Sequence, residues 1–214
     1  MNYTGRITLF SMYLAVLLTE LLLGKDFNWG DSIGDILFAI LAWGVGSIID
    51  RLRFLSFNDF LTQVHNRRYG DKIIPKLLNK AKLREETLTI FSIDVNNFKS
   101  LNDRYGHGIG DLALKKLSEI LVNYTRRNDA IIRWGGDEFL IVSPNVNKED
   151  ALPIVERINK AVELEVSKIK DENIQLGISI GFSTFPYDGH TFDELLSCAD
   201  KKMYSIKFQK KTVG

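Results

Sequence analysis

The chain has 214 residues, of which 45% are hydrophobic and 26% charged, and its formal net charge is +1. This composition is typical of a folded protein and excludes a disordered, collagen-like or low-complexity chain. The near-zero net charge gives no general case for a nucleic-acid polymer as partner. The single cysteine, Cys198, excludes a disulfide framework and a cysteine-rich zinc site, and it fits a reducing compartment.

The first part of the chain contains two long apolar runs and few charges. The runs cover residues 7–24 and 36–49, and the second reaches further back to residue 33 if one acid is included. Because about 20 predominantly apolar residues cross a membrane as a helix, we expect a transmembrane helical hairpin within residues 1–53, with spans at about 7–24 and 33–49. An amphipathic hairpin packed on the rest of the protein is the alternative.

Basic residues predict the orientation of this hairpin. Arg6 precedes the first run, Arg51 and Arg53 follow the second, and the connecting loop is mainly acidic. The positive-inside rule then places both ends in the cytoplasm, as in a multi-pass protein of an inner membrane. A signal peptide is disfavoured, because no small-residue cleavage site follows Gly24.

From residue 54 to residue 214 the sequence predicts one α/β domain. Its apolar periodicity indicates helices over residues 57–81, 108–126, 148–168 and 192–208, and strands over 88–95, 130–134, 139–142 and 174–184. Mixed elements of this kind predict an α+β sandwich, in which helices cover a central sheet.

Two acidic positions are candidates for chemistry. Asp94 ends an apolar strand, where a carboxylate is costly unless it is paired or bound to metal; a turn or N-cap acid is the plainer alternative. Asp137 and Glu138 follow Gly135 and Gly136, which permit a tight turn. Side chains alternate along a strand, so at most one of these two acids readily shares a metal with Asp94. A plain hairpin remains the alternative for this turn.

Together with several other motifs, these residues resemble the GGDEF family of diguanylate cyclases. The resemblance covers about residues 55–210 and rests on motifs in the same order and spacing: Asp59-Phe60-Leu61-Thr62, Asp94-Val95-Asn96-Asn97-Phe98-Lys99, Asn102-Asp103, Tyr105-Gly106-His107, Gly110-Asp111, Arg133-Trp134-Gly135-Gly136-Asp137-Glu138-Phe139, Ser179-Ile180-Gly181, and Ala199-Asp200 with Met203-Tyr204 and Lys207. It implies a fold like the palm of nucleotide cyclases and polymerases, with a largely antiparallel central sheet flanked by helices.

The resemblance also implies a reaction, in which two GTP molecules give cyclic di-GMP and two pyrophosphates. Each 3′-hydroxyl attacks the α-phosphorus of the other GTP, so a homodimer is required, with Mg²⁺ or Mn²⁺ as cofactor, two ions per site. The implied metal ligands are the side chains of Asp94 and Asp137 and the carbonyl of Val95. Asp137 also helps to deprotonate the hydroxyl, and Glu138 supports the site from the other face. The organism implied is a bacterium.

Substrate-binding residues follow from the same resemblance. Asn102 and Asp111 match the positions that read guanine, whose paired donors adenine lacks. The remaining matches are His107 near the substrate, the backbone N–H groups of Phe98 and Lys99 at the phosphates, and Lys207 and Lys211 at the triphosphate. The chain departs from the family pattern at Asn96, where a second acid is usual, and at residues 210–212, where Lys-Lys-Thr replaces Gly-Arg-Asn.

Arg126 and Asp129 match an inhibitory site at which such enzymes bind their product. Arginine suits phosphate and the guanine edge, although basic residues are also common at the end of any helix.

Two further functions stay open: a catalytically silent receptor for GTP or cyclic di-GMP, and a cyclase with a different nucleotide product. The intact acids of the Gly135–Phe139 motif argue against the silent receptor, and Asn102 with Asp111 favours guanine.

Overall fold

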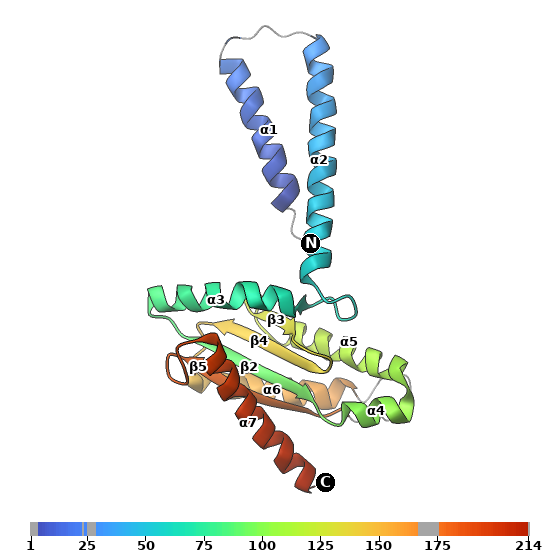
Figure 1. Ribbon diagram of the computed structural model, residues 1–214, viewed down its shortest axis with the longest axis vertical. Coiled ribbons are helices and arrows are strands. Elements are labelled where there is room, and N and C mark those ends of the chain that lie inside the picture. Colours follow the sequence, from blue (N-terminus) through green and yellow to red (C-terminus); the bar gives the residue numbers. More distant parts are fainter. Residues whose placement is uncertain (1–3, 23, 25–28, 167–175, 214) are drawn as a thin grey trace. The chain divides into compact units, whose positions relative to one another are not determined.

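The computed structural model describes residues 4–22, 24, 29–166 and 176–213 (Figure 1). The chain divides into two compact units, residues 1–57 and 58–214, which are described separately below.

The first unit consists of two helices, α1 (Thr4–Leu22) and α2 (Trp29–Phe57), which pack against each other. Glycines allow a close crossing, because a Cβ atom on Gly5 would lie 2.9 Å from the carbonyl oxygen of Gly46. The buried carboxylate of Asp50 accepts hydrogen bonds from the backbone N–H groups of Gly5, at 2.7 Å, and Arg6, at 3.2 Å. Asp50 of α2 therefore satisfies free N–H groups at the start of α1.

The predicted transmembrane hairpin is not supported. Within the described residues, neither α1 nor α2, nor any other helix, is long and apolar enough to cross a membrane. The prediction followed the apolar runs at 7–24 and 33–49 and gave too little weight to the polar residues that interrupt them, such as Ser11, Thr19 and Glu20 in α1. This finding contradicts the predicted multi-pass location in an inner membrane.

The second unit is built on a mixed five-stranded sheet with strand order β1-β3-β4-β2-β5. The strands are β1 (His65–Asn66), β2 (Leu88–Val95), β3 (Ala130–Arg133), β4 (Glu138–Pro144) and β5 (Ile178–Phe185). Strand β1 pairs with β3 in parallel, and the other neighbours are antiparallel. The helices are α3 (Arg67–Arg84), α4 (Phe98–Tyr105), α5 (His107–Asn123), α6 (Lys148–Val166) and α7 (Phe192–Val213).

Two hydrophobic cores lie on the two faces of this sheet. Helices α5 and α6 cover one face, where Leu117 and Ile158 pack with Phe91 of β2. Helices α3 and α7 cover the other face, where Leu78 and Leu195 pack with inward-facing strand residues. The flanked sheet agrees with the predicted fold class.

Two elements begin later than predicted. The predicted helix at 57–81 is instead a loop followed by α3, because Asn66 caps α3 by accepting a hydrogen bond from the Tyr69 N–H at 3.1 Å. The predicted strand at 174–184 is β5 from residue 178, and residues 174 and 175 lie outside the described part of the chain.

Gly181 sets the distance between helix α7 and the sheet. It lies in β5, and a Cβ atom there would overlap the carbonyl oxygen of Ala199 and the backbone nitrogen of Met203, both in α7. The backbone of α7 thus rests directly on β5, a close approach that any larger residue prevents.

We therefore expect Gly181→Ala to lower the free energy of unfolding by about 1–3 kcal/mol, since helix α7 must move away from the sheet. Urea unfolding followed by circular dichroism measures this change. Gly108→Ala is the matched control, because a Cβ atom at Gly108 in α5 meets nothing within 4 Å. Equal effects of the two substitutions would contradict this account of Gly181.

Candidate active site

The end of β2 and the beginning of β4 bring the predicted acids together. In the antiparallel pairing of these strands, Asp94 lies opposite Glu138. The N–H group of Val95 donates a hydrogen bond to the carbonyl oxygen of Asp137 at 3.2 Å. Residues that are more than 40 positions apart in the sequence thereby share one edge of the sheet, as the prediction of a shared site requires.

The turn between β3 and β4 is held by its own backbone and by Arg133. The N–H group of Trp134 donates to the carbonyl oxygen of Glu138 at 2.8 Å, which closes the turn. The guanidinium of Arg133 donates to the carbonyl oxygen of Gly136 at 2.8 and 3.2 Å. Both bonds fix the position of the residue that immediately precedes Asp137.

Arg133 in turn is held by Asp59, from the loop before β1. Their Nη1 and Oδ1 atoms lie 2.8 Å apart, and the same carboxylate accepts hydrogen bonds from the N–H and hydroxyl groups of Thr62. Burial raises the pKa of Asp59, but the hydrogen bonds from Arg133 and Thr62 outweigh it, so that this pKa lies below its ordinary value. In the sequence, Asp59 and Arg133 were identified only as members of two family motifs, and their contact was not predicted.

Negative charge is concentrated at this edge. Asp94 is 8% exposed. Partial burial and then the charge of Asp94 raise the pKa of Asp137 above its ordinary value. Glu138 is more exposed, but its carboxylate lies against Gly135; partial burial and the charges of Asp137 and Asp94 raise its pKa as well. Three carboxylates thus interact electrostatically across the turn.

Lys207 of α7 provides a positive charge to this cluster. Its Nζ atom lies 2.5 Å from Oδ1 of Asp94. One helical turn earlier, Met203 rests on Gly181, so the close approach of α7 to β5 determines where Lys207 reaches the sheet.

The donor set fits a divalent cation that arrives with a phosphate ligand. Among the described residues, no group of three or more His, Cys, Asp or Glu side chains has a metal-binding arrangement. Mg²⁺, however, is typically held by one or two carboxylates together with substrate phosphates and water, rather than by an all-protein cage. Asp94 and Asp137, with the carbonyl of Val95, match that pattern.

The predicted guanine-reading residues lie on the helices that follow β2. Asn102 lies in α4, and its Oδ1 atom is buried without a hydrogen-bond partner in the part of the chain that the structure describes. A Cβ atom at Gly110 of α5 would overlap that oxygen. Glycine at this position therefore leaves room for the Asn102 amide. Asp111 and His107 are exposed on α5.

The phosphate-binding candidates have a suitable backbone. Asn97 precedes α4 with φ of 55° and provides no side-chain cap for that helix. The N–H groups of the first turn, including those of Phe98 and Lys99, therefore lack the acceptor that a capping side chain supplies. Lys211 lies in the last turn of α7, and its side chain is outside the described part of the chain.

Arg126 and Asp129 form a turn of their own between α5 and β3. The N–H group of Arg126 donates to Oδ2 of Asp129 at 2.8 Å, and that of Asp129 donates to the Arg126 carbonyl oxygen at 2.9 Å. Oδ1 of Asp129 is buried and has no hydrogen-bond partner within the described ranges. Within the described residues, this carboxylate oxygen thus receives no hydrogen bond, and Arg126 is exposed.

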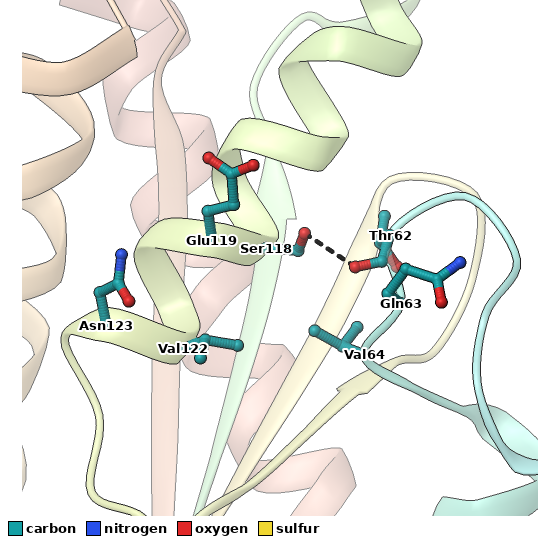
Figure 2. A pocket seen from close by; sticks show the side chains of 7 residues that line it. All are labelled: Thr62, Gln63, Val64, Ser118, Glu119, Val122 and Asn123. Carbon is teal, nitrogen blue, oxygen red and sulfur yellow. Dashed lines mark hydrogen bonds between the residues drawn. The ribbon is translucent and has the colours of Figure 1, made fainter. Parts of the chain in front are cut away.

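A hollow of about 260 Å³ lies elsewhere, between residues 62–64 and helix α5 (Figure 2). Two of the residues that line it are joined, because the hydroxyl of Ser118 donates to the carbonyl oxygen of Thr62 at 3.2 Å. None of the predicted site residues lines this hollow, so it gives no support to the assignment of the acidic edge.

Comparison with known proteins identifies the family. Residues 56–212 match the family described as diguanylate cyclase, GGDEF domain, and the chain belongs to it. Diguanylate cyclase A of Treponema denticola is 32% identical over 156 residues, which are 72% of this chain and 42% of that protein. The chain spans less than half the length of the curated relatives it matches.

Solved structures agree with the fold. The GGDEF domain of YfiN (TpbB) from Pseudomonas aeruginosa is 31% identical, with a TM-score of 0.67 over 71% of this chain and 89% of that one. A microbial GGDEF domain studied for its interaction with cyclic di-GMP is 29% identical, with a TM-score of 0.63 over 74% of this chain and 94% of that one.

The raised pKa of Asp137 predicts that the metal-free protein becomes more stable when this charge is removed. A carboxyl group whose pKa is raised in the folded state lowers the free energy of unfolding at neutral pH, where the group is charged. Well below pH 3.8, its ordinary pKa, the group is protonated in both the folded and the unfolded state, and this cost vanishes. We expect Asp137→Asn to raise the free energy of unfolding at pH 7 in EDTA by about 0.5 kcal/mol, a small value because water screens the half-exposed charge.

This difference should disappear as the pH falls toward 3.8, and urea unfolding at several pH values measures it. Asp71→Asn, on the exposed surface of α3, is the control and should show no such gain. An Asp137→Asn variant that is less stable than the parent at pH 7 would refute the electrostatic cost.

Proposed function

We propose that the chain is a diguanylate cyclase, which condenses two GTP molecules to cyclic di-GMP and two pyrophosphates. The observation that carries this proposal is the position of Asp94 beside the Gly135–Asp137 turn, with the raised pKa of Asp137. An acidic edge of this kind binds a cation and, through it, a triphosphate. Membership of the family and 32% identity to a protein named diguanylate cyclase support the reaction.

Asp94, Asp137 and the Val95 carbonyl would hold Mg²⁺ or Mn²⁺. When bound, such ions neutralise the triphosphate and lower the pKa of a coordinated hydroxyl, and two ions per site are typical of this chemistry. Asp137, next to the ion and to the reacting hydroxyl in this proposal, would also help to remove the proton of the 3′-hydroxyl. Partial burial and then the charge of Asp137 raise the pKa of the neighbouring Glu138, which we assign a supporting role from the other face.

Guanine recognition is assigned to Asn102 and Asp111, with His107 close to the substrate. The buried Oδ1 atom of Asn102 is an acceptor in need of a donor, and guanine presents N1–H and an amino group. The uncapped N–H groups at Phe98 and Lys99 would bind phosphate oxygens, and the side chains of Lys207 and Lys211 would bind the triphosphate.

Each domain supplies one GTP, so bond formation requires two copies of the chain face to face. A homodimer therefore belongs to the proposal, and its formation is the natural point of control.

The function is tested by incubating the full chain with GTP and Mg²⁺ and analysing the products by liquid chromatography and mass spectrometry. We expect cyclic di-GMP from the parent and from the Asp71→Asn control, and a loss of at least about a hundredfold in Asp137→Ala, in line with the removal of a group that acts on the reacting hydroxyl. Added ATP tests for mixed products.

Binding of GTP or cyclic di-GMP without turnover, in a chain shown to be dimeric, would refute the cyclase and favour a silent receptor. A product that contains adenine would refute the guanine assignment of Asn102 and Asp111.

We also propose that the turn of Arg126 and Asp129 binds the product and inhibits synthesis. Oδ1 of Asp129 has no hydrogen-bond partner among the described residues, and Arg126 in the same turn is exposed, so the turn contains both an acceptor and a cation that can donate to phosphate. We expect Arg126→Ala to raise the half-inhibitory concentration of cyclic di-GMP by about tenfold or more, as the loss of charged hydrogen bonds implies. The control is Arg127→Ala, an exposed neighbour that should leave inhibition unchanged. Unchanged inhibition in Arg126→Ala would contradict the proposal.

A further inference from the structure

The ion pair between Lys207 and Asp94 has a consequence for metal binding. Asp94 is the one proposed metal ligand whose carboxylate carries a direct contact with a cationic side chain among the described residues, at 2.5 Å. The two side chains are 22% and 11% exposed, so the pair is largely shielded from water. Charges at this distance and burial interact more strongly than they do at an open surface.

The packing of α7 on the sheet brings Lys207 to Asp94, so the contact does not depend on a mobile side chain that extends through solvent. Asp200, two turns earlier on the same helix, accepts a hydrogen bond from the Ser92 hydroxyl at 2.6 Å. Ser92 and Asp94 alternate with Ile93 and so point to the same face of β2. Helix α7 therefore contacts β2 at two points, through Asp200 and through Lys207.

The same ammonium reduces the negative charge of the whole acidic edge. Lys207 acts against the mutual repulsion of the carboxylates at both Asp137 and Glu138. Asp94 is nearly buried, and an isolated buried carboxylate is costly. Lys207 thus provides, in the chain itself, part of the neutralisation that a divalent ion would provide.

A divalent ion on Asp94 and an ammonium on the same carboxylate repel each other. The ion must therefore displace Lys207 or bind more weakly beside it. A nucleotide triphosphate resolves this conflict, because its phosphate oxygens accept the displaced ammonium.

We propose that Lys207 is a built-in counter-cation of the metal site, which holds Asp94 until a metal–nucleotide complex draws the ammonium away to the triphosphate. This inference rests on the proposed function only in taking Asp94 as a metal ligand and a triphosphate as the ligand beside it. It couples the two binding events, so that a bare metal ion binds the empty site poorly.

The test is the affinity of the nucleotide-free full chain for Mn²⁺, measured by electron paramagnetic resonance of the free ion. Removal of the ammonium should strengthen binding of the bare ion and weaken binding of the metal–nucleotide complex, whereas general damage to the site weakens both. We expect Lys207→Met to tighten Mn²⁺ binding by about tenfold, which corresponds to about 1.4 kcal/mol, because the cation no longer competes with the ammonium for Asp94.

Three controls accompany this variant. Lys201→Met removes an exposed lysine of the same helix and should leave Mn²⁺ affinity unchanged. Lys207→Arg retains the charge and should keep the weak binding of the parent. Asp94→Asn should abolish the tight binding in the Lys207→Met background, which assigns the ion to this carboxylate. Circular dichroism establishes that each variant is folded, and Lys207→Gln replaces Lys207→Met if the latter is not.

Unchanged or weaker Mn²⁺ binding in a folded Lys207→Met or Lys207→Gln variant would overturn the inference. The measurement needs no turnover, so it is independent of the product assay. A chain that makes no cyclic di-GMP but shows the tighter binding would refute the proposed function and retain the counter-cation, and an active chain without the shift would do the reverse.

Discussion

The antiparallel pairing of β2 with β4 places several carboxylates at one edge of the sheet, and the rest of the second unit is arranged around this electrostatic cost. Asp94 lies opposite Glu138, and Asp137 is joined to Val95 through the backbone. Partial burial, and after it the neighbouring like charges, raise the pKa of Asp137 and Glu138. These acids do not serve stability, because neutral side chains at the same positions would avoid the repulsion and give a more stable metal-free fold. The cost is understandable in a site that a cation completes.

Two rigid supports keep this edge in place. From one side, Asp59 holds Arg133, and Arg133 holds the carbonyl oxygen of Gly136 in the turn. From the other side, Gly181 lets α7 rest on β5, which brings Lys207 to Asp94. The supports come from segments distant in the sequence, so the geometry of the site depends on the whole unit being folded. Binding groups held by rigid elements are a general requirement for precise chemistry on phosphates.

Local patterns allowed a large part of the fold to be predicted from the sequence. The apolar, β-branched run of residues 88–95 is β2, and the glycine pair at 135–136 is the turn between β3 and β4. Strand β1 was not expected, because two residues carry no periodic pattern. The loop before β1 was mistaken for helix, since its turn is fixed by the Asp59 side chain and not by backbone propensity.

Contacts between distant segments explain most of what the sequence did not show. The Asp59–Arg133 pair joins residues 74 positions apart, and Lys207 and Asp94 are 113 apart. Single-sequence patterns carry no information on such pairs. The hairpin prediction failed for a different reason: none of the helices in the described ranges is long and apolar enough for a span, and polar residues such as Ser11, Thr19 and Glu20 interrupt the first apolar run. Roles for Asn102, Asp111, Arg126 and Asp129 came from motif positions and remain predictions.

We propose that a divalent cation, bound together with a nucleotide, completes the acidic edge at Asp94 and Asp137. The most direct measurement is a crystal structure of the chain with Mn²⁺ and a non-hydrolysable GTP analogue, in which anomalous scattering locates the ion. We expect an anomalous peak between the carboxylates of Asp94 and Asp137, with the Lys207 ammonium in contact with the triphosphate. A nucleotide bound elsewhere, or an ion that contacts neither carboxylate, would contradict it.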